Sequence, residues 1–484
     1  MKRKIVLVLL LILCLLLPTA LSACSFTKPV RKLYVYNWGE YLSLETGEDG
    51  VHVNHAFEAW YEALYGEKVE VVYSVFSSNE EMYAKLKNGA SRIDLIVPSE
   101  YMVERLMKED MLLPIDYSLI PTYEDTIEPR FQAMATKPYC VPYTYGYLGL
   151  IYDASIDEAL RDENGEISWR VLWNQLPNKD VDLSGNILSF NNSRDAFGIA
   201  QFLLNYEKSR ELSLPLGTDL YVNSTDRARW DEVYALLCEQ RGVLQAYVMD
   251  EIYNKMEGGH ALLASYYAGD YFTMVGVNED LCFAYPKEGT NFFYDAMCIP
   301  KDAKNADLAH AYISFMLGGA EGEALDIAIA NAEWVGYSSP NLLVSTNPDY
   351  LADMIDEEYG YGADALSILY PDTDTEALLS LIEPYAEWRA AEMEENDGEY
   401  DIEDYEGELP DAAFFAENKQ AFVTYIYENL DNETLEYANG RWEALKLEST
   451  PATDIYIMSG VIVLVLMGIG LLYFFLLRYR ARFY

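Results

Sequence analysis

An alternation of strand-like and helix-like segments constrains the fold of this chain more than any other feature of its sequence. Segments rich in β-branched and aromatic residues are predicted to be strands over residues 32–38, 68–76 and 93–97. Segments with apolar residues at helical spacing are predicted to be helices over residues 51–65, 79–88 and 101–108. Strand and helix in turn are typical of an α/β layer built on a parallel sheet.

The second half of the chain also alternates between strand-like and helix-like segments. Strands are predicted over residues 186–190 and 260–267, and helices over 195–206, 230–240 and 306–317. A chain of 484 residues, of which 51% are hydrophobic, can bury a large core and is expected to form more than one lobe. The predicted fold is therefore α/β with two lobes rather than one large sheet.

The N-terminal segment has the pattern of a bacterial lipoprotein signal. Three basic residues at positions 2–4 precede an apolar run over residues 5–17, and small residues then lead to Cys24. We expect residues 1–23 to be a signal peptide, Cys24 to be lipidated, and residues 24–31 to be a short tether. An ordinary signal peptide with a nearby cysteine is the alternative.

The C-terminal segment has the pattern of a membrane span. Residues 455–477 contain no Asp, Glu, Lys or Arg, and the run is about long enough to cross a bilayer. Three arginines follow within residues 478–484, and basic flanks favour the cytoplasmic side. The sequence predicts a transmembrane helix with a cytoplasmic tail, and a buried core helix is the alternative. Both ends place residues 24–454 outside the cytoplasm, at the cell membrane.

The chain is strongly acidic, with a formal net charge of −45. The two terminal segments hold six of the 34 Lys and Arg residues and none of the 79 Asp and Glu residues, so residues 24–454 carry 28 minus 79, a formal charge of −51. Such a surface repels phosphate groups, which excludes a general nucleic-acid binder. Cationic partners are favoured, because a negative field attracts them.

Four cysteines remain besides Cys24, at positions 140, 238, 282 and 298. An extracytoplasmic location permits disulfides, but spacing alone does not assign the pairs among Cys140, Cys238, Cys282 and Cys298. The chain has no CxxC pair and only four histidines, so neither a metal site nor another cofactor is expected.

Residues 394–409 are almost entirely acidic residues, glycine and tyrosine. Like charges repel one another and resist packing, so a solvated loop or a flexible insert is expected there. Calcium binding is open, although the spacing does not match an EF-hand loop.

Carboxylate and aromatic residues gather in segments at the ends of the predicted strands. The carboxylates are Glu40, Asp195 and Asp295. The aromatic and hydroxyl residues are Trp38, Tyr41, Ser99, Tyr101, Tyr266, Phe293 and Tyr337. Ligands in open α/β sheets bind at the carboxyl ends of strands, where such loops converge.

This combination suits a linear polyamine. Its ammonium groups stay protonated at neutral pH, much as lysine does, and separated carboxylates can each accept hydrogen bonds from one of them. Aromatic faces pack the methylene groups and attract the cations. Each residue also has a structural alternative: Trp38 and Tyr41 as core aromatics, Glu40 and Asp195 as exposed charges or helix caps, and Ser99 as a helix N-cap.

An ordered succession of motifs covers about residues 32–345. The motifs are NWGEY at 37–41, YSVFSSNEEMYAKL at 73–86, DLIVPSEY at 94–101, VPYTYG at 141–146, YPKEG at 285–289 and VGYSSPN at 335–341. Together they resemble the spermidine/putrescine-binding proteins of bacterial polyamine ABC importers, which have the type II periplasmic-binding-protein fold. The resemblance implies an extracytoplasmic solute-binding subunit that captures polyamines and delivers them to a permease and an ATPase subunit.

The resemblance also implies a set of ligand contacts, with some departures from the family pattern. The implied contacts are Trp38, Glu40, Tyr41, Ser99, Tyr101, Asp195, Tyr266, Phe293, Asp295 and Tyr337. Asp195 replaces a glutamate of the family, and Tyr266 and Phe293 replace tryptophans. Asn192 replaces an aspartate and Gly39 a small hydroxyl residue, which leaves the preference among polyamines open.

The implied mechanism is hinge closure of two lobes, without catalysis. The first lobe is predicted from residues 32–143 with 295–340, the second from 144–294 with 341–446, with crossovers near 140–146 and 292–300.

Two other functions remain open. One alternative is a membrane-tethered polyamine sensor or scaffold. An extracytoplasmic hydrolase is a further alternative, but the sequence has neither a GxSxG nor an HExxH motif, and no catalytic residue is expected.

Overall fold

The computed structural model describes residues 30–46, 50–89, 92–134, 136–319, 323–356, 360–396 and 398–448. The predicted signal peptide, Cys24 and the predicted transmembrane helix at 455–477 lie outside these residues. Within the described ranges, no helix combines the length and apolar character that a membrane crossing requires.

The strands are joined in one hydrogen-bonded path, in the order β2-β1-β3-β10-β5-β8-β6-β7. The bounds along this path are β1 Arg31–Trp38, β2 Val69–Phe76, β3 Leu95–Ile96, β5 Cys140–Asp153, β6 Ile187–Phe190, β7 Leu244–Val248, β8 Leu263–Tyr267 and β10 Thr290–Pro300. The short strands β4 Leu112–Leu113, β9 Leu281–Ala284 and β11 Thr424–Tyr425 pair beside it. Strands β1, β2 and β3 run parallel at one end of the path, and β6, β7 and β8 run parallel at the other.

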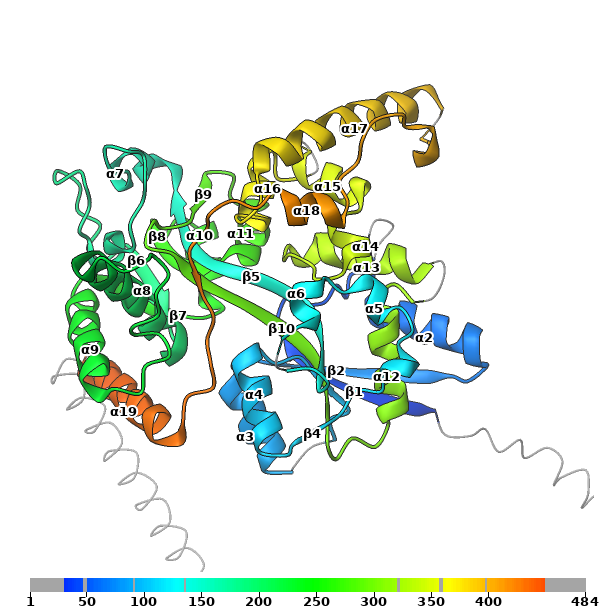
Figure 1. The fold of residues 1–484 in the computed structure, drawn as a ribbon, viewed down its shortest axis with the longest axis horizontal. Helices are drawn as coiled ribbons and strands as arrows, with labels where there is room; N and C mark the ends of the chain where they lie inside the picture. The colour runs from blue at the N-terminus through cyan, green and yellow to red at the C-terminus, as the bar shows by residue number, and fades with distance from the viewer. Residues whose placement is uncertain are drawn as a thin grey trace, which may run out of the picture.

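Helices pack around both of these parallel regions, and the helices of residues 348–395 gather beside one another away from the parallel strands (Figure 1). Those of eight or more residues are α2 Val53–Tyr65, α3 Asn79–Lys87, α4 Glu100–Lys108, α8 Ser193–Leu212, α9 Arg227–Arg241, α11 Ala268–Val275, α12 Ala306–Met316, α13 Glu323–Val335, α15 Pro348–Ile355, α17 Thr375–Glu395 and α19 Asn432–Glu448. The shorter ones include α5 Tyr123–Thr126, α6 Pro129–Gln132, α7 Asp157–Leu160, α10 Glu251–Glu257, α14 Leu342–Ser345, α16 Asp364–Leu369 and α18 Ala412–Glu417. The elements predicted for residues 32–108 are present, with ends shifted by a few residues.

Two long antiparallel strands, β5 and β10, cross the middle of the molecule side by side and connect its two halves (Figure 1). The first core contains buried residues from 33–147 and 294–324, and the second core contains residues from 148–284 and 425–445. Each core is therefore assembled from separate parts of the chain; β5 contributes to both cores, and β10 contributes to the first. The predicted α/β fold agrees with this arrangement of strands and helices.

A third cluster of buried residues lies beside α11. It combines Ala268 and Phe272 of α11 and Ala328 of α13 with residues of α14 to α17, among them Tyr350 and Tyr385. The division of residues 32–446 into two lobes remains a prediction, and this cluster shows that residues 344–385 pack mainly with one another and with α11.

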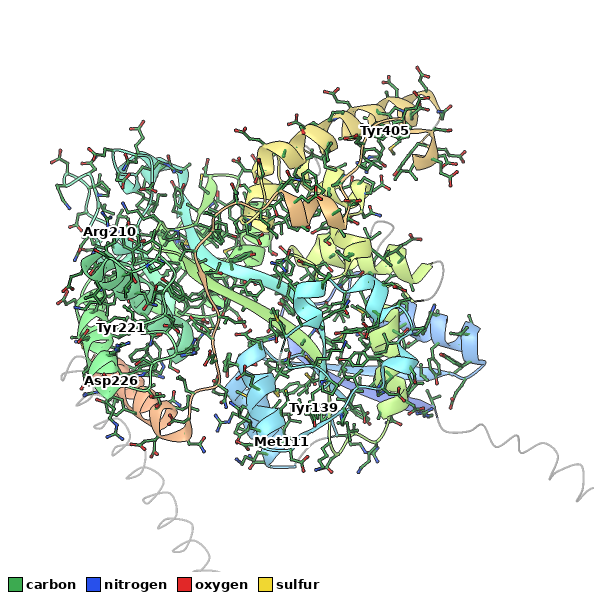
Figure 2. All side chains as sticks on the ribbon, in the orientation of Figure 1. Met111, Tyr139, Arg210, Tyr221, Asp226 and Tyr405 are labelled. Carbon is green, nitrogen blue, oxygen red and sulfur yellow. The ribbon has the colours of Figure 1, made fainter. Side chains whose placement is uncertain are left out.

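The acidic segment at 394–409 folds back against α15 and α17. Its described Asp and Glu side chains are exposed, as the sequence predicts. Its tyrosines are anchored, however: the Tyr400 hydroxyl donates to an Asp349 carboxylate oxygen at 2.6 Å, and the Tyr405 ring packs 5.1 Å from Trp388. Figure 2 shows Tyr405 beneath the long helix α17. The expectation of a solvated segment holds for its charges, whereas packing of its aromatic rings holds the segment in place.

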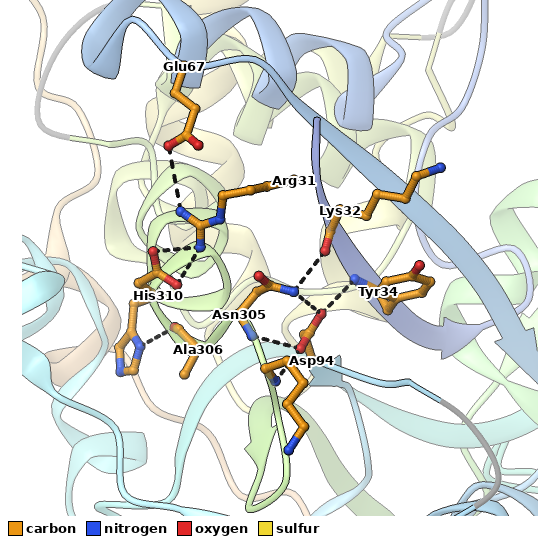
Figure 3. A network of polar contacts seen from close by, with 10 residues as sticks. Arg31, Lys32, Tyr34, Glu67, Asp94, Asn305, Ala306 and His310 are labelled. Atoms are coloured by element: carbon orange, nitrogen blue, oxygen red, sulfur yellow. Dashed lines mark hydrogen bonds and ion pairs between the residues drawn. The ribbon is translucent and has the colours of Figure 1, made fainter. Parts of the chain in front are cut away.

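A buried carboxylate, Asp94, ties β1 to the start of α12 (Figure 3). It accepts hydrogen bonds from the backbone N–H of Tyr34 at 3.2 Å, from those of Lys304 and Asn305 at 2.8 and 3.0 Å, and from the Asn305 amide at 3.1 Å. The exposed Arg31–Asp307 pair lies nearby at 2.7 Å. The network holds the first half of β1 in place, and the last residues of β1 reach the cavity described below.

Candidate ligand-binding cleft

A cavity of about 410 Å³ lies between the two cores. Residues from the end of β1, the starts of α4, α8 and α11, and the middle of β10 line it. The structure brings all ten predicted contact residues to this cavity: Trp38, Glu40, Tyr41, Ser99, Tyr101, Asp195, Tyr266, Phe293, Asp295 and Tyr337. The three predicted carboxylates thus share one cleft.

Asp295 lies at the centre of β10, where a bulge separates its pairing from that of Ala296. Its carboxylate accepts hydrogen bonds from the Tyr41 hydroxyl at 2.7 Å and from Ser99 Oγ at 2.6 Å. Burial raises the pKa of Asp295 to about 6, and these two donors oppose the shift. Ser99 is at the N-cap position of α4, as expected, but its hydroxyl is directed to Asp295 instead of capping the helix.

Asp195 lies in the first turn of α8, and two side chains donate to its carboxylate. The Asn192 amide donates at 2.7 Å and the Tyr267 hydroxyl at 2.6 Å. Asn192 also caps the helix, because its Oδ1 accepts from the Asp195 backbone N–H at 2.8 Å. Burial raises the pKa of Asp195 above its ordinary value.

Asp270, which was not predicted from the sequence, is a third carboxylate with the same kind of environment. It lies in the first turn of α11 and accepts hydrogen bonds from Tyr253 and, at 2.8 Å, from Tyr337. Burial raises the pKa of Asp270 to about 6. Asp270 lies four residues after the predicted contact Tyr266, at the start of a helix that follows a strand. This position in the sequence could have marked Asp270 as a site residue.

Five further carboxyl groups among the described residues line the cavity: Glu40, Glu80, Glu100, Asp250 and Glu257. Glu40 is exposed at its rim, where the backbone has a φ of 47°. Glu100 is buried, and burial holds its pKa well above its ordinary value, whereas Glu80 is exposed at the surface, although desolvation by its surroundings raises its pKa. The Glu100 carboxyl accepts a hydrogen bond from the backbone N–H of Tyr294 at 3.2 Å.

Aromatic rings form a continuous wall along the cavity. Tyr41 and Tyr337 have ring centroids 5.1 Å apart, Tyr337 and Phe293 6.1 Å, Phe293 and Tyr267 5.4 Å, and Tyr267 and Tyr266 5.1 Å. Gly269 makes room for this wall, because a Cβ atom at that position would lie 2.2 Å from the Tyr337 ring. The predicted contacts Tyr41, Tyr266, Phe293 and Tyr337 therefore form one surface.

Among the described residues that line the cavity, Arg194 alone carries a positive charge. Its guanidinium donates to the carbonyl oxygens of Val222 and Glu428 at 3.2 and 3.3 Å and stacks 4.2 Å from the Tyr427 ring. Arg194 thus holds the C-terminal segment that brings Tyr427 into the cavity. Tyr427 was not predicted as a contact, because this segment lies far along the chain from the predicted contacts.

The fold and the cleft define a class of protein: an α/β binding protein whose ligand site lies between two cores joined by crossing strands. Residues 56–355 match the family of bacterial extracellular solute-binding proteins. The chain belongs to this family.

Relatives agree with this assignment. The chain is 28% identical over 359 residues to the spermidine/putrescine-binding periplasmic protein of Escherichia coli, an alignment that covers 71% of this chain and 84% of that protein. It is 25% identical over 375 residues to a putrescine/cadaverine-binding protein of Pseudomonas aeruginosa, covering 75% and 92%. A crystal structure of the substrate-binding protein of a spermidine/putrescine ABC transporter from Streptococcus pneumoniae has a TM-score of 0.55 and 26% identity, covering 87% and 100%. The predicted resemblance is confirmed.

Proposed function

We propose that this chain is the solute-binding subunit of an ABC importer and that its cleft binds a linear polyamine. The observation that carries the proposal is the placement of Asp195, Asp270 and Asp295 in one cavity, each hydrogen-bonded by neutral donors. Arg194, the one cation among the described lining residues, is engaged with the C-terminal segment and also lowers the pKa of Asp195 through its charge. The described lining therefore holds more negative charge than its single cation compensates.

A polyamine supplies what these carboxylates lack. A buried carboxylate is costly unless it is paired, and an ammonium group provides both the charge and the hydrogen-bond donors. The donors already on each carboxylate hold its orientation, so little rearrangement is needed when the cation arrives. The ring wall from Tyr41 to Tyr266 would pack the methylene groups between the ammonium groups, with about 0.5 to 2 kcal/mol for each cation–ring contact.

Other small solutes fit the lining less well. An amino acid or another carboxylate ligand needs a cation to face its negative charge, whereas Arg194 stacks on Tyr427 and donates to backbone oxygens. The named relatives from Escherichia coli and Pseudomonas aeruginosa are binding proteins for spermidine, putrescine or cadaverine. Both considerations favour an amine with several charges.

Capture is proposed to work by hinge closure, without any bond made or broken. The strands β5 and β10 connect the two cores, and Asp295 lies on one of them. Contacts from both sides of the cleft stabilise the closed form only to the extent that they are absent in the open form. The closed protein then delivers its ligand to a permease that an ATPase subunit drives.

Membrane attachment completes the proposed topology. A lipid on Cys24 and a helix over 455–477 would hold the binding domain at the outer face of the cell membrane, with residues 478–484 in the cytoplasm. Fractionation of cells that express the chain, with alkaline extraction of the membranes, tests this topology. Recovery of the chain in the soluble fraction would contradict it.

Titration calorimetry on the purified chain tests the proposed ligand class. We expect spermidine, putrescine or cadaverine to bind with a Kd of about 0.1 to 10 μM, which corresponds to roughly −7 to −10 kcal/mol. Glutamate and a neutral sugar serve as ligands that should produce no heat. Absence of both heat and thermal stabilisation with all three amines would reject the assignment.

Replacement of the central carboxylate tests the site. Asp295→Asn removes a charged hydrogen-bond acceptor and is expected to weaken amine binding by about 1.5 to 3 kcal/mol. The matched control is Asp302→Asn, because Asp302 is an exposed aspartate close to Asp295 in sequence and its loss changes the net charge equally. Equal affinities of the two variants would remove Asp295 from the site.

A further inference from the structure

Two cysteines face one another across the strands that connect the cores. In the antiparallel pairing of β5 with β10, Cys298 lies directly opposite Cys140. Both are buried free thiols in the structure, and the Cys298 thiol donates to the carbonyl oxygen of Ala296 at 3.5 Å. The two positions are separated by more than 150 residues in sequence, so spacing alone could not pair them.

The backbone geometry at this pair is the kind that a cross-strand disulfide requires. Ala296 lies opposite Pro142, and a proline cannot donate, so these two residues cannot exchange two hydrogen bonds. Because bonded and non-bonded pairs alternate along an antiparallel ladder, Met297–Val141 is the bonded pair and Cys298–Cys140 a non-bonded one. The Cα atoms of non-bonded pairs are about 4.5 Å apart, which is within the range of disulfides.

The neighbours of the two cysteines support this reading. The Tyr117 hydroxyl donates to the carbonyl oxygen of Cys140 at 3.1 Å, so that carbonyl has a partner other than β10. On its other side Cys298 pairs with Ile96 of β3. The Cys140 carbonyl and the Cys298 backbone therefore have partners away from the other cysteine, as a non-bonded pair requires.

We infer that Cys140 and Cys298 are joined by a disulfide in the exported protein. Two S–H bonds break and one S–S bond forms. The two electrons and two protons reduce the disulfide of an oxidised exchange protein of the extracytoplasmic compartment to two thiols. Because both side chains are buried in the folded chain, the exchange takes place before β5 and β10 close over them.

The bond would fix the register of the connecting strands beside the ligand site. Cys298 is three residues from Asp295, on the far side of the bulge, and the pairing places Asp295 opposite Thr144. Thr144 in turn lies within hydrogen-bond distance of the Tyr41 hydroxyl, at 2.5 Å. A covalent link at 140–298 would prevent a register shift that moves Asp295 away from Tyr41. The inference rests on the extracellular family and on the strand geometry, and it is independent of which solute binds.

Peptide mapping tests the bond directly in the full chain, expressed in a bacterial host that exports it. Free thiols are alkylated during denaturation without reductant, and the protein is then digested with trypsin. Each described cysteine falls in its own peptide: Cys140 in 131–161, Cys238 in 230–241, Cys282 in 256–287 and Cys298 in 288–301. We expect a linked species of 131–161 with 288–301 that reductant separates, and alkylated peptides for Cys238 and Cys282.

A variant provides the matched control. In Cys140→Ala the peptide 288–301 is expected to be alkylated, and the thermal midpoint is expected to fall by several degrees relative to the unaltered chain. Reductant should lower the midpoint of the unaltered chain in the same direction and leave that of the variant unchanged. Recovery of 131–161 and 288–301 as separate alkylated peptides from the unaltered exported chain would overturn the inference, as would a link from either one to Cys238 or Cys282.

Discussion

At the scale of single residues, the burial of Asp295 and Asp270 sets the protonation behaviour of the cleft. Asp295 and Asp270 are separate carboxyl groups whose pKa burial raises to about 6, although each accepts hydrogen bonds from two hydroxyl groups. A group of this kind is poised to lose its proton when an ammonium ion arrives. Ligand binding and proton release are therefore expected to be linked.

The first prediction at this scale is a pH dependence of amine binding. Because the amine stays charged while both carboxyls take up protons below pH 6, affinity is expected to fall by about 10- to 100-fold between pH 7.5 and pH 5.0. The folding stability of the amine-free protein should change with pH in the opposite direction to the affinity for amines. Carboxyls with raised pKa values favour the folded state below their ordinary pKa, and this contribution is lost as pH rises through about 6.

Calorimetry and thermal unfolding over this pH range measure both effects. Asp295→Asn removes one of the two titrating groups and is expected to show a shallower pH profile for binding. An affinity that stays constant from pH 7.5 to pH 5.0 would contradict the link.

A second prediction concerns Glu100, whose pKa burial holds well above its ordinary value. Replacement by an amide of the same shape tests whether this shift leaves the carboxyl neutral at pH 7.5, because a neutral carboxyl loses no charge in the exchange. Glu100→Gln is therefore expected to bind amines within about threefold of the unaltered chain, in contrast to Asp295→Asn. Parallel titrations of the two variants decide this, and a loss as large as that of Asp295→Asn would show that Glu100 is ionised in the complex.

The sequence predicted those site residues that lie in motifs at strand ends, and all ten of them line the cavity. It missed residues that reach the cavity from other places. Tyr253 lies on α10 and donates to Asp270, and Tyr427 arrives on a segment held by Arg194. Neither position has a local pattern that distinguishes it from an ordinary buried tyrosine, because the contacts that define it depend on tertiary structure.

At the scale of elements, the register of β10 and the anchoring of β1 place the site. The sequence predicted the strand at β1, because β-branched and aromatic residues mark it, whereas residues 292–300 were predicted only as a crossover between lobes. It could not predict the bulge after Asp295, since a bulge depends on pairing with β5 about 150 residues earlier. Similarly, the anchoring of 394–409 depends on Trp388 and Asp349, which no periodicity within the acidic segment reveals.

A prediction at this scale tests the Asp94 network. Asp94→Ala leaves the N–H groups of Tyr34, Lys304 and Asn305 without their acceptor, and it is expected to lower the free energy of unfolding by about 3 kcal/mol. The control is Asp307→Ala, which removes only the exposed pair with Arg31 and should cost less than about 1 kcal/mol. Urea denaturation compares the two, and equal losses would show that Asp94 does not anchor β1.

At the scale of the whole molecule, charge is expected to affect how fast the ligand arrives. Residues 24–454 carry 28 Lys and Arg against 79 Asp and Glu, and such a field attracts a polycation over about one Debye length. Stopped-flow fluorescence, with Trp38 in the cavity as the reporter, is expected to show an association rate that falls several-fold from about 20 to 200 mM salt.

Two amines provide the internal comparison for this prediction. Spermidine carries three charges and putrescine two, so the decrease with salt should be steeper for spermidine. Equal salt dependence for both amines, or none, would show that the acidity of the surface serves another purpose.

The division of each core between distant parts of the chain has a consequence for biogenesis. The first core needs residues 294–324 to pack with 33–147, and the second needs residues 425–445 to pack with 148–284. Contacts between such distant segments form slowly, because long loops must close before they contribute stability. Neither core can be completed until most of the polypeptide has been synthesised. An extracellular protein gains from this delay, since a nascent chain that has not yet collapsed can still be threaded through a translocation channel.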